Sequence, residues 1–249
     1  MKFGKKMAAA RFYCPEIPAQ SGAAELPEQA AHHAARVLRL KEGDAVTVFN
    51  GQGGEGEARI AAIGKRGVGI EITAWHTVER ESPLRVVLAQ AISAGEKMDF
   101  TLQKAVELGV QAIQPLASER SVVKLSGERA EKRVAHWQGV AIAACEQSGR
   151  NRVPEVAPIR PLYEWLGQQD QTGLRLMLSP VADIGLRDLP TPTGSTTLLI
   201  GPEGGFSEAE GKAAQRAGYI PVRLGARVLR TETAALAMLA AMQALWGDF

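Results

Sequence analysis

A glycine-rich turn that carries a carboxylate is the stretch of this sequence best suited to chemistry. The stretch LLIGPEGGFSEAE runs from a branched apolar strand into a turn with three glycines, one proline and Glu203. Glycines permit backbone conformations and close approaches that a Cβ would forbid, and proline stiffens the turn. A carboxylate at this point repels phosphate but suits a cation or a polar N–H group. Taken alone, the motif favours a plain loop that exposes a glutamate.

The residues after the turn indicate where a helix begins. Ser207 and Glu210 have the spacing of a capping box, which leaves 201–206 as the loop. The next strand, PVRL, also ends in an unusual loop, GARVLRTET, in which Thr231 is expected to N-cap a long helix with Glu232 in its first turn. Two loops at consecutive strand ends therefore converge on the edge where open α/β sheets bind ligands.

Other patterns in the sequence do not indicate a nucleotide or metal site. Gly51, Gly53 and Gly56 have G-x-G-x-x-G spacing, but the alternating residues after them predict a hairpin, not the helix that would meet a pyrophosphate. No G-x-x-x-x-G-K-[ST] motif is present, which excludes the P-loop nucleotide hydrolases. The adjacent His32 and His33 cannot share a helical face, and no third metal ligand is evident.

Composition predicts a cytoplasmic protein with no disulfide framework. The 249 residues are 45% hydrophobic, which suffices for buried cores, and Cys14 and Cys145 stand far apart. The basic start MKFGKKMAAA is interrupted by Arg11 too early for a signal peptide, and no run approaches a membrane span of roughly 18 apolar residues. Because the net charge is only +2, any contact with RNA must come from local patches.

The elements that must position the two loops fall into two predicted domains. Residues 44–74 alternate with period two between NGQGG and GKRG turns, which predicts a mostly β domain that ends near Trp75. Before them, LPEQAAHHAARVLRL is expected to form a helix with one apolar face made of Ala30, Ala34, Val37 and Leu38.

The remainder, 76–249, has the rhythm of one α/β domain. ERESP is charged and ends in proline, as linkers do. Apolar strands such as PLRVVLAQAI, AIQPL, LRLMLSP and TTLLI then alternate with helices, of which the longest covers about 127–148. The helix in SGEKMDFTLQKAVELG is expected to be capped by Ser93 or Asp99. Strands buried on both faces and separated by helices predict a mainly parallel sheet.

The chain resembles the bacterial ribosomal RNA small-subunit methyltransferase E family in several long motifs, namely GPEGG, LGARVLRTET, SGEKMDFTLQKAVELG, PLASERSVVKL and IAACEQSGRNRVPE. RFY and HHAARVLRLKEGD extend the resemblance to the N-terminal half. This family makes N3-methyluridine in 16S RNA and belongs to the SPOUT, or trefoil-knot, methyltransferases. Two positions depart from the family pattern, because Ala226 stands where proline is usual and Ser148 where cysteine is common.

The resemblance implies features that spacing alone does not predict. Residues 76–249 are expected to form a SPOUT α/β domain whose end threads into a deep trefoil knot, and residues 1–75 a PUA-like β-barrel that binds RNA. The active unit is expected to be a homodimer. S-adenosylmethionine is expected to bind among the knot loops, at Leu178, Ile200, Gly201, Glu203, Gly204, Leu224, Gly225, Leu229 and Thr233.

Methylation of a uracil N3 sets the residue types that such a site needs. The methyl group must be aligned with N3, which must lose its proton or have its anion stabilised. Glu203 is the candidate proton acceptor, with a role in shaping the loop as the alternative. Arg230 and Arg152 are candidates for holding the developing negative charge. The residues expected to contact RNA, with a solvated surface as the alternative role, are Arg11, His33, Arg36, Arg39, Arg150 and Asn151.

The sequence thus predicts an S-adenosylmethionine-dependent methyltransferase that acts on N3 of a uridine in 16S rRNA of the small ribosomal subunit, with no metal and no membrane association. A related knotted enzyme that methylates the ribose 2′-oxygen is the first alternative. A non-catalytic RNA-binding factor of ribosome assembly is the second.

Overall fold

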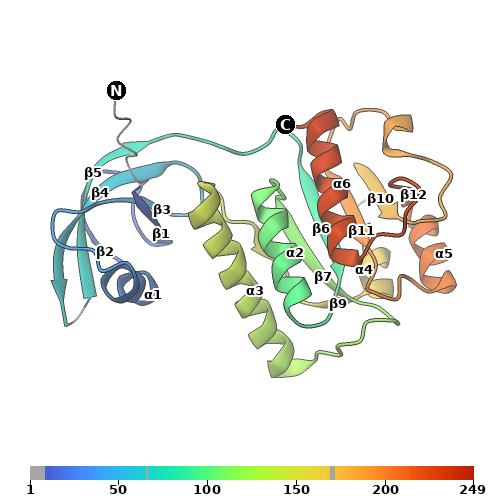
Figure 1. Cartoon of the computed structure of the whole chain (residues 1–249), viewed down its shortest axis with the longest axis horizontal. Coiled ribbons are helices and arrows are strands. Elements are labelled where there is room, and N and C mark those ends of the chain that lie inside the picture. Colours follow the sequence, from blue (N-terminus) through green and yellow to red (C-terminus); the bar gives the residue numbers. More distant parts are fainter. Residues whose placement is uncertain (1–8, 66, 169–171) are drawn as a thin grey trace. The chain divides into compact units, whose positions relative to one another are not determined.

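The computed structural model describes residues 9–65, 67–168 and 172–249, and Figure 1 shows their helices and strands. Residues 1–8, on which most of the expectation about a signal peptide depends, lie outside these ranges. Within the described ranges, no helix combines the length and the apolarity that crossing a membrane requires.

The chain divides into two compact units. The first unit comprises the described residues up to Glu81 together with Cys145–Val153, and the second comprises Ser82–Ala144 and Pro154–Phe249. The predicted boundary at Trp75 did not include the segment that returns from the second half of the chain. The reason is visible in the ion pairs of residues 79–81, which bind that segment within the first unit.

The first unit contains a five-stranded sheet in the order β1-β3-β4-β5-β2. Its strands are β1 (Ala10–Tyr13), β2 (Gly22–Glu25), β3 (Ala45–Phe49), β4 (Glu55–Gly64) and β5 (Gly67–His76). The hairpins β3-β4 and β4-β5 follow the period-two pattern, and β1 pairs with β3 in parallel. Gly51 and Gly53 therefore lie in a hairpin turn and Gly56 lies in β4, which accounts for their spacing without a dinucleotide.

The helical segment before β3 departs from its predicted apolar face. It consists of α1 (Glu28–His32) and the π-helical η1 (His33–Val37). Ala30 and Ala34 are buried as predicted, but Val37 is 61% exposed and Leu38 is 42% exposed. A π-turn contains more residues than an α-turn, so the residues that follow rotate away from the buried stripe.

The second unit contains a seven-stranded sheet in which every strand pairing is parallel, as the buried apolar strands predict. Its order is β12-β10-β11-β6-β7-β8, with β9 also paired to β7. The strands are β6 (Val86–Ala91), β7 (Ala112–Ala117), β8 (Glu155–Val156), β9 (Arg160–Pro161), β10 (Leu174–Leu178), β11 (Thr196–Ile200) and β12 (Ile220–Val222). The predicted class, an α/β domain with a mainly parallel sheet preceded by a small β domain, is confirmed.

Helices cover both faces of the parallel sheet. They are α2 (Glu96–Glu107), α3 (Gly127–Ser148), α4 (Leu162–Gly167), the short η2 (Leu186–Asp188), α5 (Glu208–Arg216) and α6 (Thr231–Trp246). Ala89 and Leu199 of the sheet pack in one core cluster with residues of α4 and α5. Their neighbours Leu88 and Leu198 point to the opposite face, because side chains alternate along a strand. There α2 and α6 lie side by side, with α6 against β11 (Figure 1).

The helix starts of α2 and α6 differ from the sequence prediction. Gly95 (φ 58°), not Ser93 or Asp99, is the N-cap of α2. The side chain of Asp99 instead turns to α3, where it accepts a hydrogen bond of 3.0 Å from Trp137 Nε1. Helix α6 begins at Thr231, so the predicted cap residue is already part of the helix.

Candidate functional site

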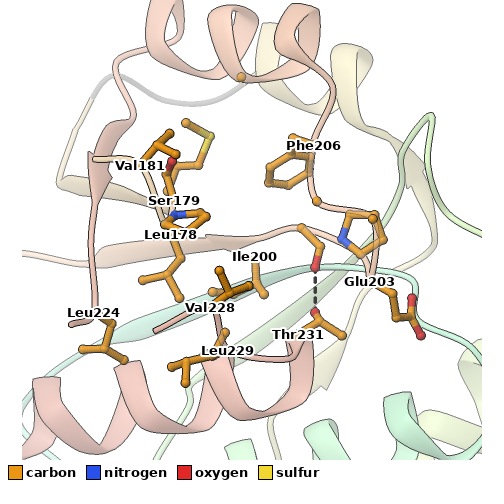
Figure 2. A pocket seen from close by; sticks show the side chains of 18 of the residues that line it. Leu178, Ser179, Val181, Ile200, Glu203, Phe206, Leu224, Val228, Leu229 and Thr231 are labelled. Atoms are coloured by element: carbon orange, nitrogen blue, oxygen red, sulfur yellow. Dashed lines mark hydrogen bonds between the residues drawn. The ribbon is translucent and has the colours of Figure 1, made fainter. Parts of the chain in front are cut away.

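A pocket of about 590 Å³ lies where β10, β11 and β12 end. Its walls are the segments after these three neighbouring strands, together with residues of α5 and of the first turn of α6 (Figure 2). The carboxyl ends of parallel strands meet at this edge, which is the usual position of ligands in open α/β sheets. The two loops expected from the sequence to converge, after β11 and β12, do so here.

Nearly all the residues expected to bind a cofactor line this pocket, namely Leu178, Ile200, Gly201, Glu203, Gly204, Leu224, Gly225 and Leu229. Thr233 is the exception, because it is exposed and lies outside the lining. Thr231 and Ala234 line the pocket in its place. Residues three apart on a helix share a face, so residues 231 and 234 point to the pocket while residue 233 points elsewhere.

The pocket combines apolar side chains with glycine backbone. Figure 2 shows Leu178, Ile200, Val228 and Leu229 gathered on one side of it, and Phe206 lies on another. Gly201, Gly204, Gly205 and Gly225 contribute backbone without a side chain in the way. A pocket of this kind suits a ligand with an apolar ring system and a few polar groups that backbone N–H and C=O groups can meet.

The GPEGG loop needs its glycines for different reasons. Gly205 has φ +64°, a left-handed conformation that favours glycine, and its N–H donates to Pro202 O to close a turn (2.9 Å). A Cβ on Gly201 would lie 3.2 Å from the amide nitrogen of Phe206, which is tighter than ordinary packing. The loop is therefore compact, and its backbone stays accessible from the pocket.

The capping box at the start of α5 is confirmed and also anchors a second loop. Ser207 Oγ accepts from the N–H of Glu210, and Glu210 Oε2 accepts from the N–H of Ser207 (3.1 and 2.8 Å). The other carboxylate oxygen of Glu210 accepts from the N–H of Glu119 (2.8 Å), in the loop after β7. Glu210 is 1% exposed, so this carboxylate links two loops from within the protein.

Glu203 lines the pocket, but its carboxylate is held by the start of α2. Its Oε1 accepts from the N–H of Ala94 (3.0 Å) and from Lys97 Nζ (3.3 Å). Partial burial opposes ionisation, but the hydrogen bonds from Ala94 and from its own backbone, together with Lys97, lower the pKa of Glu203. In Figure 2 the carboxylate points away from Leu178 and Leu229. This geometry favours the alternative in which Glu203 shapes the loop.

Thr231 connects the two loops that converge on the pocket. Its hydroxyl donates to the carbonyl of Gly201 (2.6 Å), a bond drawn in Figure 2, and accepts from Gln90 Nε2 (3.1 Å). Gln90 is fully buried at the end of β6, and Thr231 is 5% exposed. The sequence indicated an N-cap at this position because a threonine hydroxyl can serve either as a cap or as a donor to a neighbouring loop, and spacing cannot distinguish the two roles.

The arginines predicted to hold negative charge lie outside the pocket lining. Arg230 is exposed and is the N-cap of α6, and Arg152 belongs to the first unit, where it pairs with Glu79. Arg227, which the sequence motifs did not single out, does line the pocket. Only the path of the loop after β12 distinguishes it from Arg230, because both have the same type and neighbouring positions.

The residues predicted to contact RNA fall into two groups in the first unit. His33, Arg36 and Arg39 are exposed at the end of the α1-η1 segment, beside the exposed Val37 and Leu38. Arg39 adopts φ 53°, which is unusual for a residue other than glycine. These side chains form an accessible basic surface with apolar neighbours.

The residues of the second group form hydrogen bonds and ion pairs within the first unit. Arg11 donates to Glu55 (2.6 Å) and to Asn151 Oδ1 (2.7 Å), and Asn151 is fully buried. Arg150 is 4% exposed and pairs with Glu81. Hydrogen bonds from Arg80 and Arg11 outweigh partial burial and lower the pKa of Glu55 to about 2. Contact of these residues with RNA stays a prediction that their burial does not favour.

In the described part of the chain, no cluster of three or more His, Cys, Asp or Glu side chains could hold a metal ion. Cys14 and Cys145 are buried free thiols, and burial raises the pKa of each to about 12. Neither thiol is therefore poised as a nucleophile.

Comparison with known proteins agrees with the two-part organisation. A family model described as an RNA methyltransferase domain matches residues 80–243, and one described as an RNA methyltransferase PUA domain matches residues 26–73. Ribosomal RNA small subunit methyltransferase E of Buchnera aphidicola is 36% identical over 90% of this chain and 91% of its own length. The protein of the same name from Bacillus subtilis is 32% identical over 85% of this chain and 86% of its own length.

Solved structures give the same result. Ribosomal RNA small subunit methyltransferase E from Neisseria gonorrhoeae, bound to S-adenosyl methionine, is 46% identical with a TM-score of 0.91, over 97% of this chain and 99% of that one. A methyltransferase from Legionella pneumophila, in complex with the cofactor SAM, is 41% identical with a TM-score of 0.93 over the same shares. The chain therefore belongs to the RNA methyltransferase family that contains the ribosomal RNA small subunit methyltransferase E proteins.

Proposed function

We propose that this protein transfers a methyl group from S-adenosylmethionine to N3 of a uridine in the 16S rRNA of the small ribosomal subunit, in the cytoplasm and as a homodimer. The observation that carries the proposal is the pocket at the ends of β10, β11 and β12. The chain shares its fold with two relatives, 46% and 41% identical, whose solved structures contain the cofactor. The names of the relatives support rRNA as the substrate, and the motif resemblance supports N3.

The residues present fit this cofactor. When bound, S-adenosylmethionine supplies a methyl group on a positively charged sulfur. Leu178 and Leu229 offer apolar contact for a flat ring, and the glycine backbone of residues 201–205 can approach polar groups closely. The apolar walls exclude water from a reacting centre, and the hydrogen-bonded loops hold their positions before the ligand enters.

Two surfaces of the described chain support the proposed partners. The exposed His33, Arg36 and Arg39 of the first unit can meet RNA phosphates. At the pocket, Val181 is 86% exposed and Val228 is 83% exposed. We take these two exposed apolar side chains as the edge of the surface that a second copy of the chain covers in the proposed dimer. Light scattering of the purified protein measures the molar mass in solution, and a monomer there would contradict this part of the proposal.

Methyl transfer to small subunits from cells that lack the modification tests the function directly. We expect label from methyl-labelled S-adenosylmethionine to appear in N3-methyluridine after digestion of the 16S RNA to nucleosides. Subunits that already carry the modification are the matched control and should accept no label.

The alternatives predict different products. Label in a 2′-O-methylated nucleoside, which resists alkaline cleavage of the backbone, would overturn the N3 assignment and identify a ribose methyltransferase. A protein that binds small subunits but shows no binding of S-adenosylmethionine in calorimetry would be an assembly factor without this activity.

A further inference from the structure

The pocket lining contains four charged side chains, Glu203, Glu208, Lys212 and Arg227. Three of them form an ion pair with a side chain of opposite charge. Glu203 pairs with Lys97 (3.3 Å), and Lys212 pairs with Glu208 (2.5 Å) one turn away on α5. Within the described ranges, Arg227 forms no ion pair, so its guanidinium is the positive charge of the pocket that lacks an anionic partner there.

The loop after β12 places this guanidinium at the mouth of the pocket. Gly225, in the left-handed region at φ +72°, turns the chain, and Arg227 Nη2 lies 3.9 Å from the position that a Cβ on Gly225 would take. The guanidinium therefore folds back over a glycine that itself lines the pocket. The side chain of Arg227 is exposed, and so is that of Val228 beside it. The donors of Arg227 thus remain available to a ligand that enters next to the loop.

We propose that Arg227 is a catalytic residue that contacts the uracil ring and stabilises its N3-deprotonated form. This inference rests on the proposed function. In the reaction the N3–H bond breaks and the proton passes to water. The electron pair left on N3 forms the new N–CH3 bond as the bond from methyl to sulfur breaks, and that bond's pair stays on sulfur. The negative charge of the deprotonated ring spreads over O2 and O4, and a guanidinium can donate two hydrogen bonds to one of these oxygens while N3 stays open to the methyl group.

The charges around the pocket favour this role for Arg227 over proton removal by Glu203. The carboxylate of Glu203 already accepts two hydrogen bonds and has a lowered pKa, so it is a weak proton acceptor. A positive charge next to the ring instead lowers the pKa of N3–H, as opposite charges within about 4–6 Å do by about 1–3 units. Water can then accept the proton at a pH closer to neutral.

The dependence of kcat on pH distinguishes this role from the others that an arginine could play. We would compare the wild-type protein with Arg227→Ala, Arg227→Lys and the matched control Arg230→Ala, which removes a neighbouring exposed arginine outside the lining. For Arg227→Ala we expect kcat near neutral pH to fall at least tenfold. The pH of half-maximal kcat should rise by about one unit, and the rate should recover towards the wild-type value at high pH. Arg227→Lys should recover part of the shift, and Arg230→Ala should show none.

Affinity measurements complete the test without depending on turnover. Calorimetry should give the same Kd for S-adenosylmethionine with Arg227→Ala as with the wild type. A weakened Kd with an unshifted pH profile would mean that Arg227 holds the cofactor, and a raised KM for small subunits with an unshifted profile would mean a phosphate contact. Either outcome overturns the inference. Failure of the proposed function is separate, because the wild-type protein would then form no N3-methyluridine.

Discussion

At the scale of single residues, the local partners of a side chain matter more than its type. Glu203 is a carboxylate in the pocket lining, which suggests a base when only the sequence is considered. Its hydrogen bonds from Ala94 and Lys97 stabilise the ionised form and lower its pKa. A carboxylate held in this way joins the loop after β11 to the start of α2. Because its pKa is lowered, it is also a weak acceptor for a proton from the substrate.

Glu203→Gln tests whether this carboxylate positions the loop or accepts a proton. The amide oxygen can still accept from the N–H of Ala94, whereas the ion pair with Lys97 is lost. We expect kcat to change by less than about threefold with an unshifted pH profile, because removing a general base would cost about 10²–10⁴-fold. The Kd for S-adenosylmethionine should rise several-fold. Glu208→Gln removes another carboxylate of the lining that is paired with a lysine and serves as the control. A loss of kcat above a hundredfold in Glu203→Gln, with no such loss in Glu208→Gln, would instead show that Glu203 acts as the general base.

At the scale of elements, the pocket is a junction of strand ends and helix starts tied together by a few hydrogen bonds. Glu203 ties the GPEGG loop to α2, Glu210 ties its end to the loop after β7, and Thr231 ties its beginning to α6. Arg120 adds a hydrogen bond of 2.9 Å to the carbonyl of Gly204. Because these bonds come from different elements, the loop has a defined shape although it is rich in glycine.

Replacement of Thr231 by valine removes the hydroxyl with little change of shape. The carbonyl of Gly201 then loses its donor and Gln90 Nε2 one of its acceptors, at a cost of about 1–3 kcal/mol for groups left unsatisfied when buried. We expect a lower free energy of unfolding in urea, and an affinity for S-adenosylmethionine about tenfold weaker by calorimetry. Thr231→Ser should restore both, and Thr233→Val, on the exposed side of the same turn, should change neither. If Thr231→Val and Thr233→Val had the same free energy of unfolding and the same Kd, the hydrogen bonds of Thr231 would not stabilise the pocket.

At the scale of the whole molecule, the first unit is completed by a segment distant in sequence. Residues 145–153 belong to the first unit, although they follow most of α3. Asn151 is fully buried there and bonds to both Arg11 and the carbonyl of Val78. The segment SGRNR therefore serves the stability of the first unit, and a fragment that ends at Glu81 would lack part of its own core.

Asn151→Ala tests this dependence. The substitution leaves Arg11 and the carbonyl of Val78 without their buried partner, which should cost about 1–3 kcal/mol. Hydrogen exchange measured by mass spectrometry should speed up in β1 and β5 and stay unchanged in β10 and β11 of the second unit. Asn50→Ala, which removes a hydrogen bond in an exposed turn, is the control. Faster exchange spread evenly over both units would contradict a local role for Asn151.

The sequence by itself determined the classes of element, the parallel sheet and the loops that form the pocket. Apolar periodicity and capping residues are local signals, so strands such as β10 and β11 and the start of α5 at Ser207 could be predicted from neighbouring residues. The long motifs also indicated the family, and the resemblance that they carry implied most of the positions that line the pocket.

Only the tertiary structure decided which side chains face the pocket and which are bound by partners within the protein. Arg227 and Arg230 are equivalent by type, and the turn at Gly225 sends only the first into the lining. Arg11, Arg150 and Asn151 match a nucleic-acid surface by composition, yet each is engaged in the first unit by partners far away in sequence. Hydrogen bonds and burial depend on how close segments that are far apart in sequence come in the folded chain. The local spacing of residues does not carry this information.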